Sequence, residues 1–160
     1  MNISDASGVI RRLWARTPAR TFVIYPIGVV AFELVIRRGQ IVVVPWGALL
    51  LAWGYLQYRL TGNYRLLHGG GGPGITVPPA RLVVAGPYAY TRNPMYLGHL
   101  IFLLGLAVTF WSWFALALFT GQAIWFHRRV LADEARLGGQ FGAQYLEYQA
   151  RVKRWVPGLL

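Results

Sequence analysis

Three long apolar runs alternate with polar segments along the chain. They cover residues 21–36 (TFVIYPIGVVAFELVI), 41–60 (IVVVPWGALLLAWGYLQYRL) and 95–126. A helix needs about 20 apolar residues to cross a bilayer, because each residue advances it by about 1.5 Å. The first two runs therefore predict one membrane helix each. The third run has 32 residues and carries Phe-Trp-Ser-Trp at its middle, which predicts two short helices folded as a hairpin.

The whole pattern predicts an all-α integral membrane protein. It has about four membrane helices, including a helical hairpin in its C-terminal half, and a cytoplasmic C-terminal helix follows. No internal repeat is visible, so a single domain is expected. Its expected parts are a basic N-terminal segment (1–20), two spans (21–60), a loop (61–93), the hairpin (94–126) and a tail (127–160).

Composition agrees with a bilayer protein, since 56% of the residues are hydrophobic and only 13% are charged. An average soluble domain has about 25% charged residues. The absence of cysteine excludes disulfides and thiolate chemistry. The formal net charge of +11 would suggest nucleic acid in a soluble protein. Here the basic residues flank apolar runs, so anionic lipid headgroups are the expected partner and nucleic acid is not.

The basic residues also predict an orientation. With four crossings, fourteen of the sixteen Lys and Arg residues fall on one side, and Arg37 and Arg38 fall on the other. The positive-inside rule then places both termini and the central loop in the cytoplasm, in the cell or inner membrane. The candidate active site lies on that same side.

The loop that precedes the third run has unusual chemistry. Asn93 is a suitable N-cap and Pro94 a suitable first helical residue, so a helix is predicted to begin there. Its free N–H groups form an anion site, to which Arg92 adds a positive charge. Tyr88 and Tyr96 add aromatic faces. The same residue types are also typical interfacial anchors, so both interpretations stay open.

A second group of polar residues follows the hairpin. Three of the five acids in the chain lie there, namely Asp133, Glu134 and Glu147. Neighbouring arginines suit local salt bridges along a helix, whereas a ligand hydroxyl or cation would also suit the carboxylates. Tyr145 and Tyr148 add aromatic surface. An anion site, carboxylates and aromatic rings together match the groups of S-adenosylmethionine, although other ligands share two of them.

Two ordered motifs carry a family resemblance. GPYAYTRNPMYLG (86–98) resembles the G-P-Y-x-x-x-R-H/N-P-x-Y-x-G signature of the integral-membrane methyltransferases. That superfamily includes isoprenylcysteine carboxyl methyltransferases and phosphatidylethanolamine N-methyltransferases. ADEARLGGQFGAQYLEYQARVKRWVP (132–157) is similar to its E-E-x-x-L…F-G-x-x-Y-x-x-Y…V-x-R-x-x-P tail. The resemblance covers about half of the chain. Two departures are Asn93, where one branch has His, and Asp133 in place of the first Glu.

The resemblance implies a cofactor, S-adenosylmethionine, held near the cytoplasmic surface by both motifs and the hairpin. Glu134 is expected to hold a polar group of the cofactor and Arg92 its carboxylate, while Tyr148 or Glu147 offers a route for a proton. No metal is expected. The resemblance marks these cofactor-binding residues: Tyr88, Arg92, Asn93, Pro94, Tyr96, Gly98, Glu134 and Tyr145. The expected catalytic residues are Glu134, Arg92 and Tyr148. The expected substrate-binding residues are Arg151, Arg154 and His99.

The expected function is methyl transfer from S-adenosylmethionine to a membrane lipid or another amphiphile. A lipid amine such as phosphatidylethanolamine is favoured; a prenylcysteine-type carboxylate and a small thiol are alternatives. One fold supports several chemistries, so the acceptor and the oligomeric state stay open. Two alternatives belong to other classes: a non-catalytic membrane scaffold, and a haem or metal protein that uses His99 and His127 as ligands.

Three further patterns have simpler interpretations. Gly98 and Gly105, like Gly47 and Gly54, are spaced as helix-packing positions. Glu33 precedes Arg37 by four residues and predicts a local ion pair. The run HGGGGPG (68–74) lacks the Lys-Ser/Thr of a phosphate-binding loop, so it predicts a flexible loop, with a lid over the cofactor as a further hypothesis.

Overall fold

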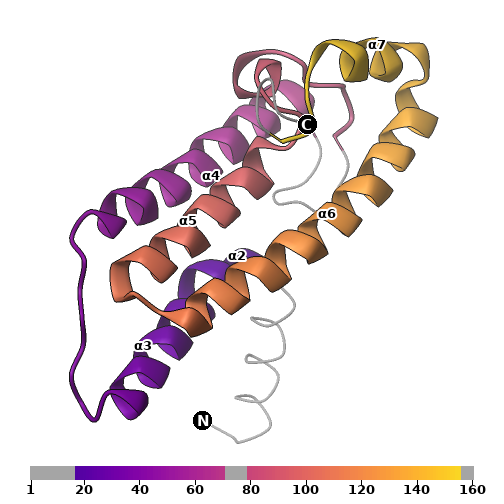
Figure 1. Cartoon of the computed structure of the whole chain (residues 1–160). Helices are drawn as coiled ribbons and strands as arrows, with labels where there is room; N and C mark the ends of the chain where they lie inside the picture. The colour runs from indigo at the N-terminus through magenta and orange to yellow at the C-terminus, as the bar shows by residue number, and fades with distance from the viewer. Residues whose placement is uncertain (1–16, 71–78, 156–160) are drawn as a thin grey trace, which may run out of the picture. The chain divides into compact units, whose positions relative to one another are not determined.

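The computed structural model describes residues 17–70 and 79–155. Most of the basic N-terminal segment, most of the run at 68–74 and Pro157 of the tail motif lie outside these residues. Every regular element in the described part is helical, which confirms the predicted all-α class (Figure 1). In chain order the elements are α2 (Thr17–Ala19), η1 (Arg20–Ile24), α3 (Tyr25–Ile36), α4 (Gly47–Gly69), η2 (Gly86–Ala89), α5 (Pro94–Phe110), α6 (Trp113–Phe141) and α7 (Ala143–Arg151).

Among the residues that the structure describes, one helical segment has the length and composition of a membrane span. α2, the π-helical turn η1 and α3 continue one another from Thr17 to Ile36, which gives 20 apolar-rich residues. α5 is also apolar but has 17 residues. The number of membrane spans, about four, therefore remains a prediction from the sequence.

The second apolar run forms a helix with different ends from those predicted. α4 begins at Gly47 rather than at Ile41. The four residues before Pro45 are β-branched, and a proline disfavours helical backbone in the residue before it. α4 also continues past Leu60 to Gly69, and it stops where Gly70 takes a positive φ of 64°. The predicted start was therefore wrong, and part of the predicted loop is helix.

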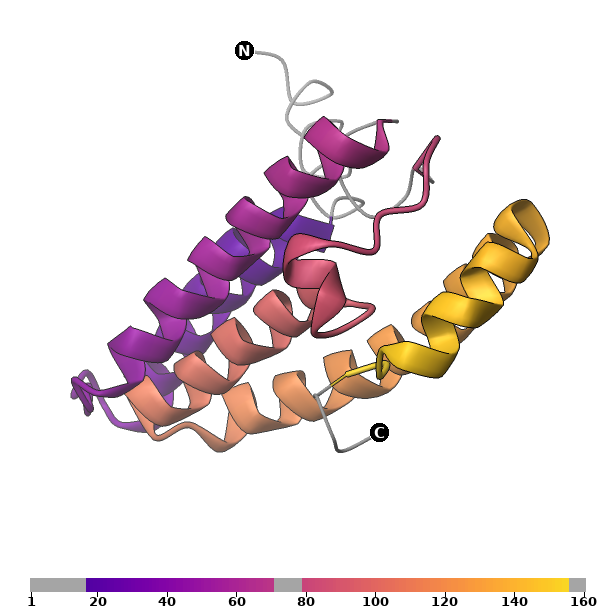
Figure 2. The same ribbon diagram turned by 90° about the horizontal axis from the view of Figure 1, so that it is seen from above.

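The predicted hairpin is confirmed. α5 and α6 are separated by Trp111 and Ser112, and the Ser112 hydroxyl accepts a hydrogen bond from the Ala115 amide at 3.1 Å. Arg37 donates to the carbonyl of Trp111 at 2.9 Å and pairs with Glu33 at 2.6 Å, so the predicted local pair also holds the end of α5. α6 is longer than expected and continues to Phe141, close to the chain reversal that precedes α7 (Figure 2).

The chain forms two compact units. The first comprises the residues up to Trp53 together with Ile101–Thr120, and the second comprises Gly54–Leu100 with Gly121–Leu160. Each has its own apolar cluster. The first cluster contains Val29, Leu103, Leu106, Ala107 and Ala115. The second contains Tyr96, Phe126 and Val130, with Leu100 and Trp155 packed against them.

Glycines of α5 permit close helix packing within each unit. A Cβ atom at Gly98 would lie 2.9 Å from the Gly54 carbonyl oxygen and 2.9 Å from the Tyr58 amide nitrogen of α4. In the first unit, a Cβ atom at Gly105 would lie 2.8 Å from the Leu51 nitrogen. No side chain fits at such distances, so the predicted packing role of both glycines is confirmed.

Candidate functional site

The two sequence motifs meet in the second unit through hydrogen bonds to backbone carbonyls of the tail. The Arg92 amide donates to the Lys153 carbonyl at 3.0 Å. The Thr91 hydroxyl and the Asn93 side-chain amide both donate to the Arg154 carbonyl, at 3.1 and 3.2 Å. The tail therefore fixes the turn from which α5 begins, and α5 begins at Pro94 as predicted.

Glu134 of α6 lies between two arginines, one from each motif. Its Oε1 is 3.0 Å from Nη2 of Arg92, and its Oε2 is 2.9 Å from Nη2 of Arg154. The Nε of Arg154 also donates to both carboxylate oxygens, at 3.2 and 3.1 Å. The Glu134 and Arg92 side chains are only 7% and 10% exposed, whereas the Arg154 side chain is 29% exposed, so the Arg92–Glu134 pair is mostly removed from water. One carboxylate between two guanidinium groups leaves a net positive charge.

The Glu134 carboxylate also affects the proton equilibrium of its partner. Its hydrogen bonds raise the pKa of Arg154 above the usual value for arginine. Arg92 gains a further anchor, because its Nη1 donates to the Gln149 carbonyl at 3.1 Å. Both guanidinium groups are therefore held in position by hydrogen bonds.

Asp133 has a separate set of partners. Its Oδ2 accepts a hydrogen bond from the Tyr96 hydroxyl at 2.8 Å, and its Oδ1 lies 2.8 Å from Nη2 of Arg136. Arg129 donates to the Tyr96 hydroxyl at 3.1 Å and lies 3.9 Å from Asp133. Adjacent acids on α6 thus belong to different ion-pair groups, because neighbouring helical residues point about 100° apart.

Three buried tyrosines complete the wall next to the Glu134 group. The Tyr148 hydroxyl donates to the Tyr88 carbonyl at 2.7 Å. Burial raises the pKa of Tyr88 to about 12, against a smaller lowering by Arg65. Burial, and then Glu134, raise the pKa of Tyr145 to about 12, and burial likewise raises the pKa of Tyr148. The three phenols are therefore neutral at physiological pH.

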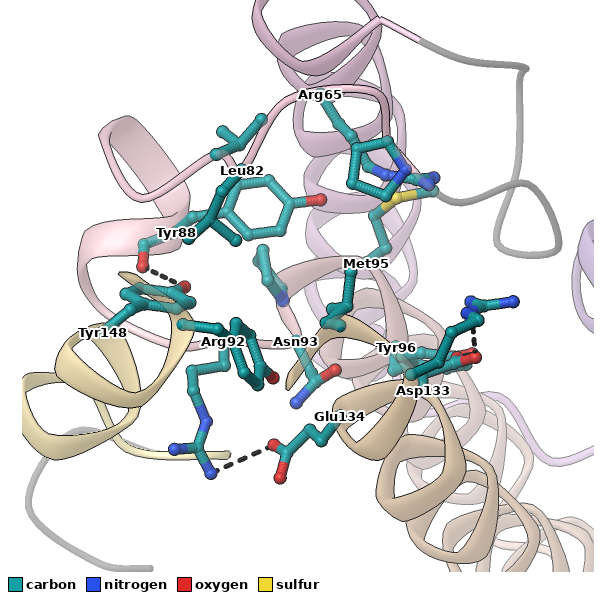
Figure 3. Close-up of a pocket in the computed structure, with 16 residues that line it drawn as sticks. Arg65, Leu82, Tyr88, Arg92, Asn93, Met95, Tyr96, Asp133, Glu134 and Tyr148 are labelled. Carbon is teal, nitrogen blue, oxygen red and sulfur yellow. Dashed lines mark hydrogen bonds and ion pairs between the residues drawn. The ribbon is translucent and has the colours of Figure 1, made fainter. Parts of the chain in front are cut away.

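These groups surround one cavity, which lies wholly within the second unit (Figure 3). Its volume is ≈ 90 Å³. Typical small-molecule sites have about 300–1,000 Å³, so the described residues enclose space for one end of a cofactor or acceptor. Eight of the predicted site residues line it: Tyr88, Arg92, Asn93, Pro94, Tyr96, Glu134, Tyr145 and Tyr148.

Four predicted site residues do not line the cavity. Arg154 contacts it through Glu134. Gly98 packs against α4, as described above. His99 is fully buried, with its ring 4.7 Å from that of Tyr58 and 5.5 Å from that of Phe126. Arg151 is exposed and lies 3.5 Å from Glu147 on the same helix, α7.

Sequence reasoning missed part of the cavity wall. Arg65 lines it from the stretch of α4 that was predicted as a loop, and it belongs to neither motif. Met95, Leu82 and Val83 add apolar surface that no motif singled out. A helical prediction for residues 61–69 would have placed Arg65 on α4, but its position at the cavity depends on how α4 packs.

The two histidines of the haem or metal alternative have different surroundings. His127 accepts a hydrogen bond at Nδ1 from the Trp155 indole at 3.4 Å, whereas His99 lies among aromatic rings. Within the described ranges, no group of three or more His, Cys, Asp and Glu side chains is placed to hold a metal ion.

Comparison with known proteins adds an independent finding. The family model for phospholipid methyltransferases matches residues 43–143. The chain is similar to the protein-S-isoprenylcysteine O-methyltransferase of Schizosaccharomyces pombe, with 35% identity over 78 residues, or 48% of this chain and 33% of that protein. It is also similar to the protein of the same name from Tribolium castaneum, with 30% identity over 77 residues, or 48% of this chain and 27% of that one. The matched regions thus span about a third or less of these curated relatives.

Proposed function

Because the chain belongs to the phospholipid methyltransferase family, we propose that it transfers a methyl group from S-adenosylmethionine to an amphiphilic acceptor. The predicted resemblance to the integral-membrane methyltransferases is confirmed by this membership. The observation that carries the proposal is the buried Arg92–Glu134–Arg154 group, which joins both motifs at a cavity.

The cavity residues suit the charged end of the proposed cofactor. Arg92 and the first turn of α5 offer positive charge and free N–H groups for its carboxylate. Tyr88, Tyr145 and Tyr148 offer aromatic surface for its positive centre. Glu134 holds the arginines, so its role is to position them. When bound, S-adenosylmethionine supplies the activated methyl group.

The charges around the cavity favour a carboxylate as the methyl acceptor. Glu134 and Asp133 each contact two arginines, so neither carboxylate is available to an acceptor ammonium without loss of an ion pair. A carboxylate acceptor is attracted to the remaining positive charge. The names of the two relatives above also favour an O-methylated acceptor, which is the prenylcysteine-type alternative from the sequence.

A carboxylate acceptor needs no proton transfer to or from the chain. It is ionised at neutral pH, since an α-carboxyl group has a pKa of about 3.3–3.7. A bond forms between a carboxylate oxygen and the methyl carbon, while the bond from that carbon to sulfur breaks. No proton moves. The hydrogen of the Tyr148 hydroxyl already binds the Tyr88 carbonyl, which suits a positioning role better than that of a base. The chain then acts by orienting the reactants and excluding water.

A lipid amine is the second candidate, since the family model is that of phospholipid methyltransferases. This was the acceptor favoured from the sequence. An amine must lose its proton around the time of transfer, and the charges of the described cavity residues would oppose the approach of its ammonium form. The test of function therefore includes phosphatidylethanolamine beside the carboxylate.

The setting of the enzyme is also part of the proposal. The 20-residue segment Thr17–Ile36 supports attachment to a membrane, and the asymmetry of basic residues supports cytoplasmic termini and a cytoplasmic site. Anionic lipid headgroups are the proposed partners of the flanking arginines.

The test begins with calorimetric binding of S-adenosylmethionine, and of its demethylated product, to protein in lipid nanodiscs. Labelled methyl transfer is then measured to an N-acetyl-S-prenylcysteine, to phosphatidylethanolamine and to a small apolar thiol. We expect saturable cofactor binding and transfer to the carboxylate above the other two acceptors. Glu134→Ala should weaken cofactor binding by about 10- to 100-fold, because two arginines lose their fixed positions.

Glu147→Ala is the matched control, since Glu147 is an exposed acid that pairs only within α7 in the described part of the chain. It should bind cofactor as the wild type does. Folded protein that binds no cofactor at millimolar concentration would contradict the enzyme and support the scaffold alternative. Methyl transfer to phosphatidylethanolamine alone would contradict the carboxylate acceptor and support a lipid amine as the acceptor.

A further inference from the structure

One face of α4 supports the first sequence motif at several points within the second unit. The Gln57 side-chain amide donates to the carbonyl of Pro94, the first residue of α5, at 3.1 Å. Nearer the end of α4, the Gly69 carbonyl accepts a hydrogen bond from the Arg81 amide at 2.9 Å. Between these two points lies Tyr64, seven residues after Gln57 and therefore on nearly the same face of the helix. This helix belongs to neither motif, yet it holds the segment that carries the first one.

The tip of the Tyr64 ring lies directly against the chain at Gly86. A Cβ atom at Gly86 would lie 2.5 Å from Cζ of Tyr64 and 2.9 Å from its hydroxyl oxygen. Gly86 also has a positive φ of 60°, a backbone conformation in which other residues are strained. The His68 ring stacks on the Tyr64 ring, with centroids 4.0 Å apart, and so restricts its movement. Because Gly86 has no side chain, a held aromatic ring can approach the backbone of the motif.

The turn that begins at Gly86 carries a residue of the cavity wall. Gly86–Ala89 forms the 3-10 turn η2, and Tyr88 within it is buried and lines the cavity (Figure 3). The Tyr88 carbonyl accepts the 2.7 Å hydrogen bond from Tyr148, so α7 holds this turn on one side and Tyr64 of α4 holds its start. Tyr64 is not among the described residues that line the cavity. Its effect on a ligand would therefore act through the turn.

We propose that Tyr64 is a positioning residue of the cofactor site, which fixes the turn Gly86–Ala89 so that the Tyr88 ring stays at the cavity wall. This inference rests on the function proposed above. An aromatic ring stabilises a positive centre only when it is held close to that centre. The positive sulfur of S-adenosylmethionine is the charge that its demethylated product lacks. Loss of Tyr64 should therefore weaken binding of the cofactor more than binding of the product.

The test measures, by calorimetry in lipid nanodiscs, the affinities of the protein for S-adenosylmethionine and for its demethylated product. Tyr64→Ala should shift the ratio of the two affinities toward the product by about 3- to 30-fold, which corresponds to one cation–π contact. Tyr64→Phe keeps the ring and should retain the wild-type ratio. A variant that only unfolds part of the protein lowers the number of binding sites and leaves this ratio unchanged.

Further variants identify the residue through which Tyr64 acts. Tyr88→Leu removes the ring at the cavity but keeps an apolar side chain, and it should shift the ratio as Tyr64→Ala does. Because both changes act on the same ring, the combined variant should show no further shift. Tyr55→Ala is the matched control: it removes an exposed tyrosine of the same helix, which is not among the described lining residues, and it should keep the wild-type ratio.

The outcomes separate this inference from the proposed function. Folded wild-type protein that binds neither ligand overturns both. If wild-type protein binds the cofactor but Tyr64→Ala keeps the wild-type ratio, or weakens both ligands equally, the role of Tyr64 alone is overturned. A combined variant whose shift equals the product of the two single shifts overturns the assignment of this effect to Tyr88.

Discussion

Arg92, in the turn before α5, and Glu134, on α6, form an ion pair 3.0 Å long with side chains that are 10% and 7% exposed. The pair joins the two sequence motifs, and Arg154 completes it from the tail. Removing Glu134 would leave two guanidinium groups in a largely dehydrated site without a counter-charge.

We therefore expect Glu134→Gln to lower the free energy of unfolding by about 2–4 kcal/mol, toward the lower end because Arg154 is partly exposed. Chemical unfolding in detergent, followed by circular dichroism, measures this. Glu147→Gln should change stability by less than about 0.5 kcal/mol, because its pair with Arg151 is exposed. Equal stability of the two variants would contradict a structural role for the buried group.

Gly98→Ala tests the packing of α5 on α4. The added Cβ would lie 2.9 Å from two backbone atoms of α4, so the helices must separate. We expect a loss of about 1–3 kcal/mol in thermal or chemical unfolding. Gly121→Ala on α6 is the control: its Cβ meets no atom within 4 Å, and alanine favours helix, so stability should rise by up to about 1 kcal/mol. An unchanged stability of Gly98→Ala would contradict the close contact between α5 and α4 at this glycine.

Tyr148→Phe distinguishes positioning from proton transfer. The variant loses the 2.7 Å hydrogen bond to the Tyr88 carbonyl, which should cost about 1–2 kcal/mol of stability. With a carboxylate acceptor, the rate of methyl transfer should fall less than tenfold, and its pH profile between pH 7 and 9 should match that of the wild type. A variant that folds normally but loses activity, or gains a new pH dependence, would instead identify Tyr148 as a proton carrier.

Stability should decrease at high pH because of the buried phenols. Folding raises the pKa of Tyr88 and of Tyr145 to about 12 from an unfolded value near 10. Their contribution is therefore complete below about pH 10 and is lost as the pH rises toward 12. Unfolding free energies measured from pH 8 to 12 should show this decrease. Tyr88→Phe should reduce this decrease, because the variant lacks one of the two phenols.

Local chemistry was enough to predict several features from the sequence. The Phe-Trp-Ser-Trp interruption placed the hairpin turn, and Pro94 placed the start of α5. Glu33 and Arg37 pair because residues four apart share a helix face. Each of these features depends on residues close together in the chain, so a short stretch of sequence determines it.

The partners of Asp133 and Glu134 show where such reasoning stops. Asp133 has an arginine four residues before it and another three residues after it, and it pairs with both, Arg129 and Arg136. Glu134, the next residue along α6, faces a different direction and pairs with Arg92 and Arg154. Local spacing gives Glu134 no arginine three or four residues away, and it does not identify Arg92 and Arg154 as partners, because that choice depends on which side of α6 the tail and the α5 turn occupy.

The sequence by itself determined the all-α class, the hairpin turn, the start of α5, the motifs and eight of the residues that line the cavity, because hydrophobic length, helix starts and motif spacing are local properties. Only the tertiary structure decided that Glu134 holds two remote arginines, that Gly98 packs against α4 and that Arg65 reaches the cavity. Those outcomes depend on contacts between segments far apart in the chain, and their energies exist only once the helices have packed.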